Sequence, residues 1–186
     1  MSVDEQFYVV NFSEEAVIKG NKQFCCGDAA LDRYVRDNNL KRQASRGNLK
    51  AILLLDSKDN LIGFITAKIN QLNKECIPNN IFPYTLPPMV TVIQIPMIAI
   101  DNTKQKQGWG TELMREAFRY TLAAAEVLPD IKGISLDAVP DAVEYYKSFD
   151  FVSISDQLDH NGNMLMFLSI ETLKLSTKVT AKEIAV

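Results

Sequence analysis

The chain has 186 residues, 47% of them hydrophobic, so it is long enough for one domain with a single sizeable core. Its 20 lysines and arginines are outnumbered by 23 aspartates and glutamates, which gives a formal net charge of −3. This balance argues against a protein built mainly to bind nucleic-acid phosphates, because such domains usually carry a basic surplus.

The elements predicted from residue patterns alternate between strands and helices. Runs of aromatic and β-branched residues predict strands, and apolar residues at helical spacing predict helices. In chain order the sequence predicts strand 7–12, helix 28–47, a hairpin of strands 49–55 and 61–70, loop 73–88, strand 90–100, helix 108–128, strand 132–138, helix 141–148, and strands 151–154 and 164–170. This order predicts an α/β (α+β) protein with a mixed central sheet. We expect a single domain over residues 1–170 and a polar, aperiodic C-terminal tail over residues 171–186.

Several of these elements have specific end signals. Asp28 is the expected N-cap of the first helix and Gly47 its C-cap. Four prolines within residues 73–88 exclude a helix interior or a central strand, so we expect a long surface loop of the kind that often borders a site. Pro96 removes a ladder donor inside strand 90–100, which should therefore bulge or lose its neighbour there.

The cysteines and the apolar stretches exclude further classes of protein. Cys25, Cys26 and Cys76 lack the spacing of a zinc site or a disulfide framework, so we expect free thiols in a reducing compartment and no metal. The first residues lack a secretory signal, and the apolar stretches are too short to span a bilayer. We therefore expect a cytoplasmic protein.

A Q-x-x-G-x-G pattern at residues 105–110 lies between strand 90–100 and helix 108–128. The first amides of a helix have no partner within the helix, and glycine lets the backbone approach an anion closely, so this loop is a candidate phosphate cradle. The lysine of a P-loop and the third glycine of a dinucleotide fingerprint are both missing. A plain turn, with glycines for geometry, is the alternative.

This loop resembles the acetyl-CoA loop of the GNAT acetyltransferase superfamily, and the order of elements resembles that family over most of the chain. The resemblance implies the GNAT acyl-CoA N-acyltransferase fold, with central strands that splay open near Pro96. It implies acetyl-CoA as co-substrate and no metal. The cofactor-binding residues that it implies are Ile98, Ala99 and Ile100 along the pantetheine arm, and Gln105, Lys106, Gln107, Gly108, Trp109, Gly110 and Thr111 around the pyrophosphate.

A second stretch, residues 137–151, resembles the family's A-x-x-F/L-Y-x-x-x-G-F segment and places Tyr146 on its tyrosine. The resemblance implies that Tyr146 is the general acid beside the CoA sulfur, and an ordinary tyrosine, with a pKa of ~10, is protonated at neutral pH. Asp150 stands where the family prefers glycine, and aspartate tolerates a left-handed backbone better than most residues. A packed aromatic side chain is the alternative role for Tyr146.

Many GNAT enzymes have a glutamate base on the strand that corresponds to residues 90–100, whereas this strand has Gln94 and no carboxylate. A backbone N–H near Ile98 is expected to polarise the thioester carbonyl. An α-amino group, with a pKa of ~8, needs less help from a base than a lysine at ~10.4. The missing carboxylate therefore favours α-amino or aminoacyl acceptors.

Residues 24–36, FCCGDAALDRYVR, resemble the F-x-C-G-x-x-x-L-D-x-Y-L-R segment of toxin-type GNAT proteins. Those proteins acetylate the α-amino group of aminoacyl-tRNA and pair with a DNA-binding antitoxin. Three functions stay open: N-acetylation of a small-molecule or protein amine, acetylation of aminoacyl-tRNA, and non-catalytic acyl-CoA binding.

The partners follow from these functions. We expect an amine acceptor, with tRNA, an antitoxin and a second copy of the chain in a homodimer as further candidates, and no membrane. A basic run of Lys41, Arg42, Arg46 and Lys50 is the first place where tRNA would bind. Such a run is otherwise a solvated helix face.

Overall fold

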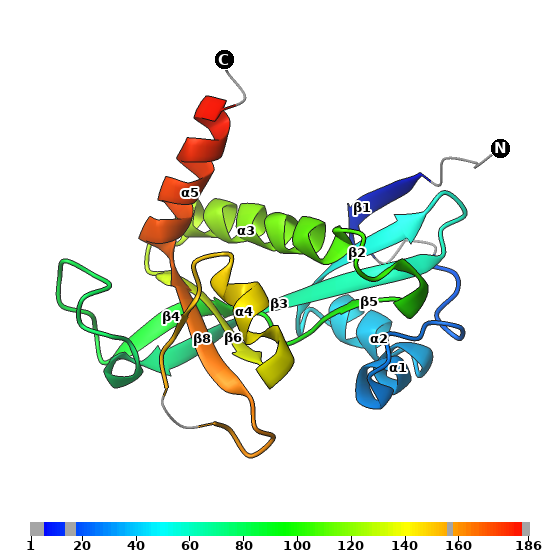
Figure 1. Ribbon diagram of the computed structural model, residues 1–186, viewed down its shortest axis with the longest axis horizontal. Helices are drawn as coiled ribbons and strands as arrows, with labels where there is room; N and C mark the ends of the chain where they lie inside the picture. Colours follow the sequence, from blue (N-terminus) through cyan, green and yellow to red (C-terminus); the bar gives the residue numbers. More distant parts are fainter. Residues whose placement is uncertain (1–5, 14–17, 156–157, 184–186) are drawn as a thin grey trace. The chain divides into compact units, whose positions relative to one another are not determined.

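A computed structural model describes residues 6–13, 18–155 and 158–183 (Figure 1). Backbone contacts divide the chain into two compact units. Unit 1 comprises Met1–Lys68 and Pro96–Ala117, and unit 2 comprises Ile69–Ile95 and Phe118–Val186. The chain passes between the units within strand β3 (Leu61–Asn73), at Pro96 and within helix α3 (Trp109–Val127).

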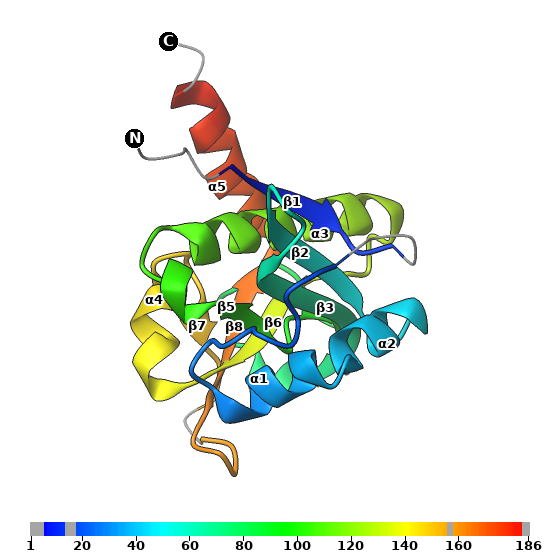
Figure 2. The same cartoon turned by 90° about the vertical axis from the view of Figure 1, so that its right-hand side faces the viewer.

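Unit 1 contains an antiparallel sheet in the order β1 (Phe7–Asn11), β2 (Lys50–Asp56), the first part of β3, and β5 (Ile98–Ile100). Helices α1 (Ala29–Arg36) and α2 (Asn39–Ser45) lie along one side of β2 and β3 (Figure 2). Alternate residues of the strands pack against them, because successive side chains of a strand point to opposite faces. The core of this face consists of Phe24, Val35, Leu40, Ala51, Leu53, Leu55, Leu61, Phe64 and Ala99.

The start and the end of the first helical region agree with the sequence. The Asp28 carboxylate accepts hydrogen bonds from the N–H groups of Ala30 and Leu31, and Gly47 closes the last turn with a φ of 69°. The prediction of one continuous helix over residues 28–47 is wrong. Asn38 adopts a left-handed conformation, with a φ of 57°, and separates α1 from α2. Asparagine is one of the few residues that tolerate this backbone.

Unit 2 contains a mixed sheet in which β4 (Met89–Gln94) pairs in parallel with β6 (Gly133–Ala138), β6 pairs antiparallel with β8 (Met164–Ser169), and β8 with β7 (Val152–Ser153). A short 3-10 turn, η3 (Pro140–Ala142), leads from β6 to helix α4 (Val143–Lys147). The predicted strand 90–100 is thus two strands separated at Pro96. Its first part, β4, pairs with β6, and its second part, β5, pairs with β3.

Residues 73–88, which we call the proline-rich loop, form the long irregular segment that the sequence predicts. Their regular part is the short 3-10 helix η1 (Lys74–Cys76). Ile77 and Phe82 of the loop are buried against the sheet of unit 2, and the Phe82 ring lies 6.2 Å from that of Phe167 on β8. The loop is therefore anchored by its own apolar side chains.

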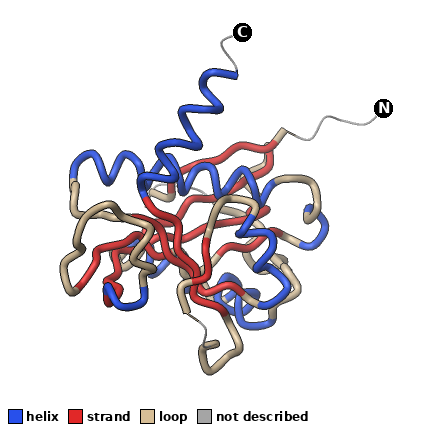
Figure 3. Tube along the Cα trace, turned by 60° about the vertical axis from the view of Figure 1, so that its left-hand side comes forward, coloured by secondary structure: helices blue, strands red, loops and turns tan. Residues whose placement is uncertain are grey.

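Helix α5 (Ile170–Glu183) occupies the segment that the sequence predicted to be a polar, aperiodic tail, so the expected lack of regular structure there is wrong. The helix follows directly on β8 and leads toward the C-terminus (Figure 3). Ser169 caps it by accepting a hydrogen bond from the N–H of Thr172, and Ile170 and Leu173 are buried. A serine followed by an acidic first turn, here at Glu171, is a helix-start signal that the sequence does carry.

The mixed sheet with helices confirms the predicted α/β (α+β) class. Among the residues that the structure describes, no helix combines the length and the apolar composition needed to cross a membrane.

Candidate functional site

Strand β5 directs the backbone groups of Ile98 and Ile100 away from its partner strand. Hydrogen bonds from Thr66 to the carbonyl of Met97 and from Asp101 to the carbonyl of Ile62 lie on either side of the Ala99–Phe64 pair. Since alternate residues of an antiparallel strand bond to the same side, the backbone of Ala99 also faces β3. The outward backbone groups along the predicted pantetheine strand therefore belong to Ile98 and Ile100.

Glycine is required where β3 passes β5. A Cβ atom at Gly63 would lie 2.5 Å from Cδ1 of Ile100 and 2.9 Å from the carbonyl oxygen of Ala99. Both distances are shorter than real Cβ contacts allow. The absence of a side chain at Gly63 thus lets β5 sit in register on β3.

The loop after β5 turns sharply into α3. A short 3-10 helix, η2 (Asn102–Lys104), precedes two positive-φ residues, Lys106 at 60° and Gly108 at 88°. The first helical hydrogen bond of α3 runs from the N–H of Glu112 to the carbonyl of Gly108. The N–H groups of residues 109–111 precede that bond and have no partner within the helix. Backbone donors at a helix N-terminus fit a pyrophosphate.

The side chain of Gln105 braces this loop. Its Nε2 donates to the carbonyl of Cys26 at 2.8 Å and to the carbonyl of Ile100 at 3.0 Å. The amide nitrogen is therefore occupied by the protein's own backbone, and Gln105 acts on the loop by holding it between β5 and the segment that precedes α1.

Asp101 and Cys25 are residues of the loop's support that the sequence did not single out. Asp101 Oδ2 accepts from the N–H of Cys25 at 3.1 Å, and Oδ1 accepts from the N–H and hydroxyl of Thr103. In return the N–H of Asn102 donates to the carbonyl of Cys25 at 2.7 Å. The Asp-x-Thr spacing is an Asx-turn signal and could have identified the Asp101–Thr103 part, but not the long-range bond to Cys25.

Trp109 packs against the first strand. Its ring centroid lies 4.7 Å from that of Phe7, and the indole N–H is buried without a hydrogen-bond partner among the described residues. The indole therefore fixes the start of α3 to β1 by apolar contact.

Tyr146, the predicted general acid, lies in α4 of unit 2 and is 8% exposed. Aromatic rings surround it: Tyr145 at 5.2 Å and Phe151 at 5.9 Å between centroids. Burial, followed by the nearby Tyr145, raises the pKa of Tyr146 to about 12. The phenol is therefore protonated throughout the neutral range. Asp150 has a φ of 66°, as its place in the family pattern requires.

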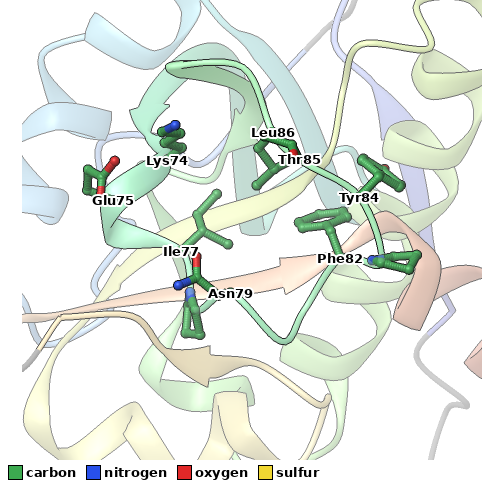
Figure 4. A pocket seen from close by; sticks show the side chains of 10 residues that line it. Lys74, Glu75, Ile77, Asn79, Phe82, Tyr84, Thr85 and Leu86 are labelled. Carbon is green, nitrogen blue, oxygen red and sulfur yellow. The ribbon is translucent and has the colours of Figure 1, made fainter.

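A pocket of about 400 Å³ lies within the proline-rich loop (Figure 4). Ile77, Phe82 and Leu86 form its apolar part, and Lys74 and Glu75 lie at one end of it (Figure 4). Polar side chains, among them Asn79 and Thr85, line the pocket as much as apolar ones do.

The ten predicted cofactor residues thus fall together on β5, the loop and the start of α3 in unit 1, and Tyr146 lies in unit 2. Within the part of the chain that the structure describes, His, Cys, Asp and Glu side chains form no group that could hold a metal ion.

Known proteins match this chain over most of its length. It is 27% identical to a tRNA-acetylating toxin of Mycobacterium tuberculosis (strain ATCC 25618 / H37Rv) over 137 residues, which are 73% of this chain and 80% of the toxin. A crystal structure of a bacterial toxin superposes with a TM-score of 0.87 at 27% identity and covers 94% of this chain and 96% of its own. A mutant of the toxin AtaT, bound to the C-terminus of the antitoxin AtaR and to acetyl-CoA, superposes with a TM-score of 0.72 at 21% identity, over 91% and 97% of the two chains.

A family model, the acetyltransferase (GNAT) domain, matches residues 9–171. This span includes β5, the Q-x-x-G-x-G loop and Tyr146. The chain therefore belongs to the GNAT acetyltransferase family.

Proposed function

We propose that this acetyltransferase transfers the acetyl group of acetyl-CoA to the α-amino group of aminoacyl-tRNA. The observation that carries the proposal is the 27% identity to a tRNA-acetylating toxin over 73% of the chain. The TM-score of 0.87 to a bacterial toxin, over nearly the whole of both chains, supports it.

Acetyl-CoA supplies the acetyl thioester, and unit 1 provides groups suited to hold it. In our proposal the outward backbone groups of Ile98 and Ile100 bind the pantetheine arm, and the N–H groups from Lys106 to Thr111 bind the pyrophosphate. Ala99 contributes by pairing β5 with β3. Gln105 contributes by holding the loop in place through its side-chain hydrogen bonds. The N–H of Ile98 would polarise the thioester carbonyl.

Acetyl transfer forms an N–C bond, breaks a C–S bond, and moves one proton from the amine nitrogen to the leaving sulfur. We assign the donation of the proton to sulfur to Tyr146, because it occupies the tyrosine position of the family pattern and its phenol, like that of an ordinary tyrosine, is protonated at neutral pH. The aromatic rings around it hold the side chain in place.

The acceptor's α-amine suits a strand β4 that ends in Gln94 rather than in a carboxylate. An α-amine has a pKa of ~8 and is partly neutral at physiological pH, whereas a lysine at ~10.4 is almost wholly charged. An enzyme without a carboxylate base on β4 therefore finds more of its acceptor already neutral when that acceptor is an aminoacyl ester than when it is a lysine.

The proposed function implies a cytoplasmic location and an antitoxin partner. Aminoacyl-tRNA is a cytoplasmic substrate, and we place the reaction in the cytoplasm. We also propose a DNA-binding antitoxin as a partner, because the similar toxin AtaT binds the antitoxin AtaR. We further propose that residues 1–170 form one catalytic domain, with residues 171–186 as a C-terminal tail, which the family match over residues 9–171 supports.

The test is transfer of labelled acetyl groups from acetyl-CoA to total aminoacyl-tRNA, with uncharged tRNA and lysine-rich peptides as parallel acceptors. The proposal expects label on the aminoacyl-tRNA only, and release of that label as N-acetyl amino acid after mild alkaline hydrolysis. Growth arrest on expression, relieved by the neighbouring gene product, would support the antitoxin. Label on peptides, with none on aminoacyl-tRNA, would overturn the proposed acceptor and favour a protein or small-molecule amine.

A further inference from the structure

One face of the unit 2 sheet changes from apolar to polar toward the carboxyl ends of its two parallel strands. Gln94 on β4 lies opposite Ser135 on β6, and Ser135 lies opposite Phe167 on β8, so these three residues share that face. Asp137 follows Ser135 by two positions and lies on the same side.

The apolar part of this face is covered by the proline-rich loop. Val90 and Phe167 are buried in one cluster with the loop residues Ile77 and Phe82. Asp137, in contrast, is exposed, and Gln94 is half-buried. The cover therefore leaves open the place where the face becomes polar.

At that place the side-chain amide of Gln94 lies beside the carboxylate of Asp137. The Nε2 of Gln94 donates to Oδ2 of Asp137 at 3.4 Å. A carboxylate has two acceptor oxygens, so a second donor can bind at Oδ1. Between the two residues Ser135 is fully buried, and its Oγ has no hydrogen-bond partner among the residues described. The structure thus concentrates polar groups here beyond what its own hydrogen bonds require.

The pairing with Asp137 explains why position 94 has glutamine rather than glutamate. A glutamate at that position would repel Asp137, whereas the neutral amide donates to it and leaves one negative charge on the pair. The carboxylate that strand β4 lacks is provided by the neighbouring parallel strand, β6.

We infer that Asp137 is the catalytic carboxylate that receives the acceptor's amine, with Gln94 as its positioning residue. The inference rests on the family's acetyl transfer to amines, and its choice of an α-amine rests on the proposed function. The charged carboxylate binds the amine through a charge-assisted hydrogen bond. It draws the amine to the end of β6, the strand from which the chain continues through η3 into α4 and Tyr146.

The proton movements then balance. As the N–C bond forms and the C–S bond breaks, the nitrogen must lose one proton and the sulfur must gain one. Before this, Asp137 Oδ1 takes a first proton from the ammonium form of the acceptor, which makes the amine neutral, and passes that proton to solvent. During the transfer Asp137 takes the second proton from nitrogen and Tyr146 gives one to sulfur, and exchange with solvent restores both side chains.

The test compares Asp137→Asn with Asp141→Asn, a matched change at an exposed carboxylate on η3. We expect Asp137→Asn to lower kcat/KM for aminoacyl-tRNA about 100-fold, within the usual range for proton-transfer residues, while the Kd for acetyl-CoA and the Tm stay unchanged. Raising the pH from about 7 to about 8.5 should narrow this deficit, because more of the amine is then neutral without help. Gln94→Leu should reproduce part of the fall in kcat/KM, and Gln94→Glu should lower kcat/KM further than Gln94→Leu does.

A second acceptor, phenylalaninamide, separates the two proposals. If phenylalaninamide is acetylated and aminoacyl-tRNA is not, the tRNA proposal fails. The role of Asp137 is then tested by the kcat/KM of the variants for phenylalaninamide. Equal losses for both aspartate variants, a deficit that does not narrow with pH, or weakened acetyl-CoA binding in Asp137→Asn would overturn the assignment. Turnover of neither α-amine by the wild type would overturn it as well, together with the proposed function.

Discussion

Tyr146 shows how burial fixes the position of a phenol. The side chain is 8% exposed and is held among aromatic rings, so the charged phenolate has little solvent to stabilise it. The same burial that raises the pKa of Tyr146 to about 12 also fixes its position. The environment therefore supplies the geometry that a general acid needs, while the phenol is protonated at neutral pH with or without the raised pKa.

Replacing Tyr146 with phenylalanine should lower kcat about 100-fold or more, because it removes the hydroxyl and keeps the ring packing. The Kd for acetyl-CoA should stay within twofold of wild type, a change of less than about 0.5 kcal/mol. Steady-state kinetics and an acetyl-CoA titration measure the two quantities. Tyr34→Phe, a half-buried tyrosine in unit 1, is the control and should retain activity. Full activity of Tyr146→Phe would return Tyr146 to a structural role.

The raised pKa of Tyr146 also predicts how stability depends on pH. Its pKa in the folded protein, about 12, lies above the ordinary value of 10.0, so the folded state retains this proton longer than the unfolded state. The resulting stabilisation is fully present below about pH 10 and is lost as the pH rises toward 12. Two pKa units correspond to about 2 to 3 kcal/mol in the free energy of unfolding.

Urea unfolding at about pH 9 and about pH 11.5 tests this prediction in wild type and Tyr146→Phe. The variant should lose less stability over this interval than the wild type, although Tyr84, whose pKa burial also raises to about 12, contributes in both. Identical losses would show that Tyr146 titrates normally.

Single residues differ in how far the sequence reveals them. Tyr146 and Asp150 belong to a local pattern, and the helix and the φ of 66° that the pattern requires are both present. Asp101 and Cys25 are 76 positions apart, and Asp137 and Gln94 are 43 apart. Each of those pairs depends on how strands are placed side by side, which no local pattern contains.

At the scale of elements, the loop before α3 depends on its brace. Gln105→Ala removes the bonds to the carbonyls of Cys26 and Ile100, each worth about 1 kcal/mol. Since these bonds shape the loop rather than the whole fold, we expect acetyl-CoA to bind about tenfold more weakly, with a Tm within a few degrees of wild type. Isothermal titration calorimetry measures the Kd.

Gln107→Ala is the matched control for this variant. Gln107 lies in the same loop, and its side chain makes one long bond, 3.4 Å, to the carbonyl of Thr103. It should bind acetyl-CoA nearly as wild type does. Equal Kd values for the two variants would mean that the brace of Gln105 does not control the cradle.

Most elements could be predicted from the sequence because their local signals agree with the fold. Pro96 separates β4 from β5, and Asp28 begins α1, each for a reason that lies within a few residues. The break at Asn38 was missed because the apolar spacing continues across it. The left-handed backbone there is indicated only by the presence of an asparagine, which tolerates that conformation. Helix α5 was missed because, among its residues 170–176, only Ile170 and Leu173 are buried.

At the scale of the whole molecule, the net charge of −3 does not favour binding of tRNA, so attraction must be local. The basic run of Lys41, Arg42, Arg46 and Lys50 lies on α2 and the start of β2 in unit 1. Lys41, Arg42 and Arg46 are exposed. Charges beyond about 10 Å are screened at physiological salt, so a run of this kind acts on a phosphate backbone independently of the acidic remainder.

Reversing two of these charges, in Arg42→Glu with Arg46→Glu, should therefore weaken aminoacyl-tRNA as a substrate and leave the chemistry intact. We expect KM for the tRNA to rise about tenfold or more. The plot of the logarithm of the tRNA association constant against the logarithm of the salt concentration should become less steep by about 1.5, because two phosphate contacts are lost. The Kd for acetyl-CoA and the turnover of phenylalaninamide should not change, since neither carries a long phosphate backbone. Lys58→Glu, in the turn between β2 and β3, is the control for a change in net charge alone. If Lys58→Glu raises KM as much per charge as the double variant does, tRNA responds to the overall charge and α2 is only a solvated helix face.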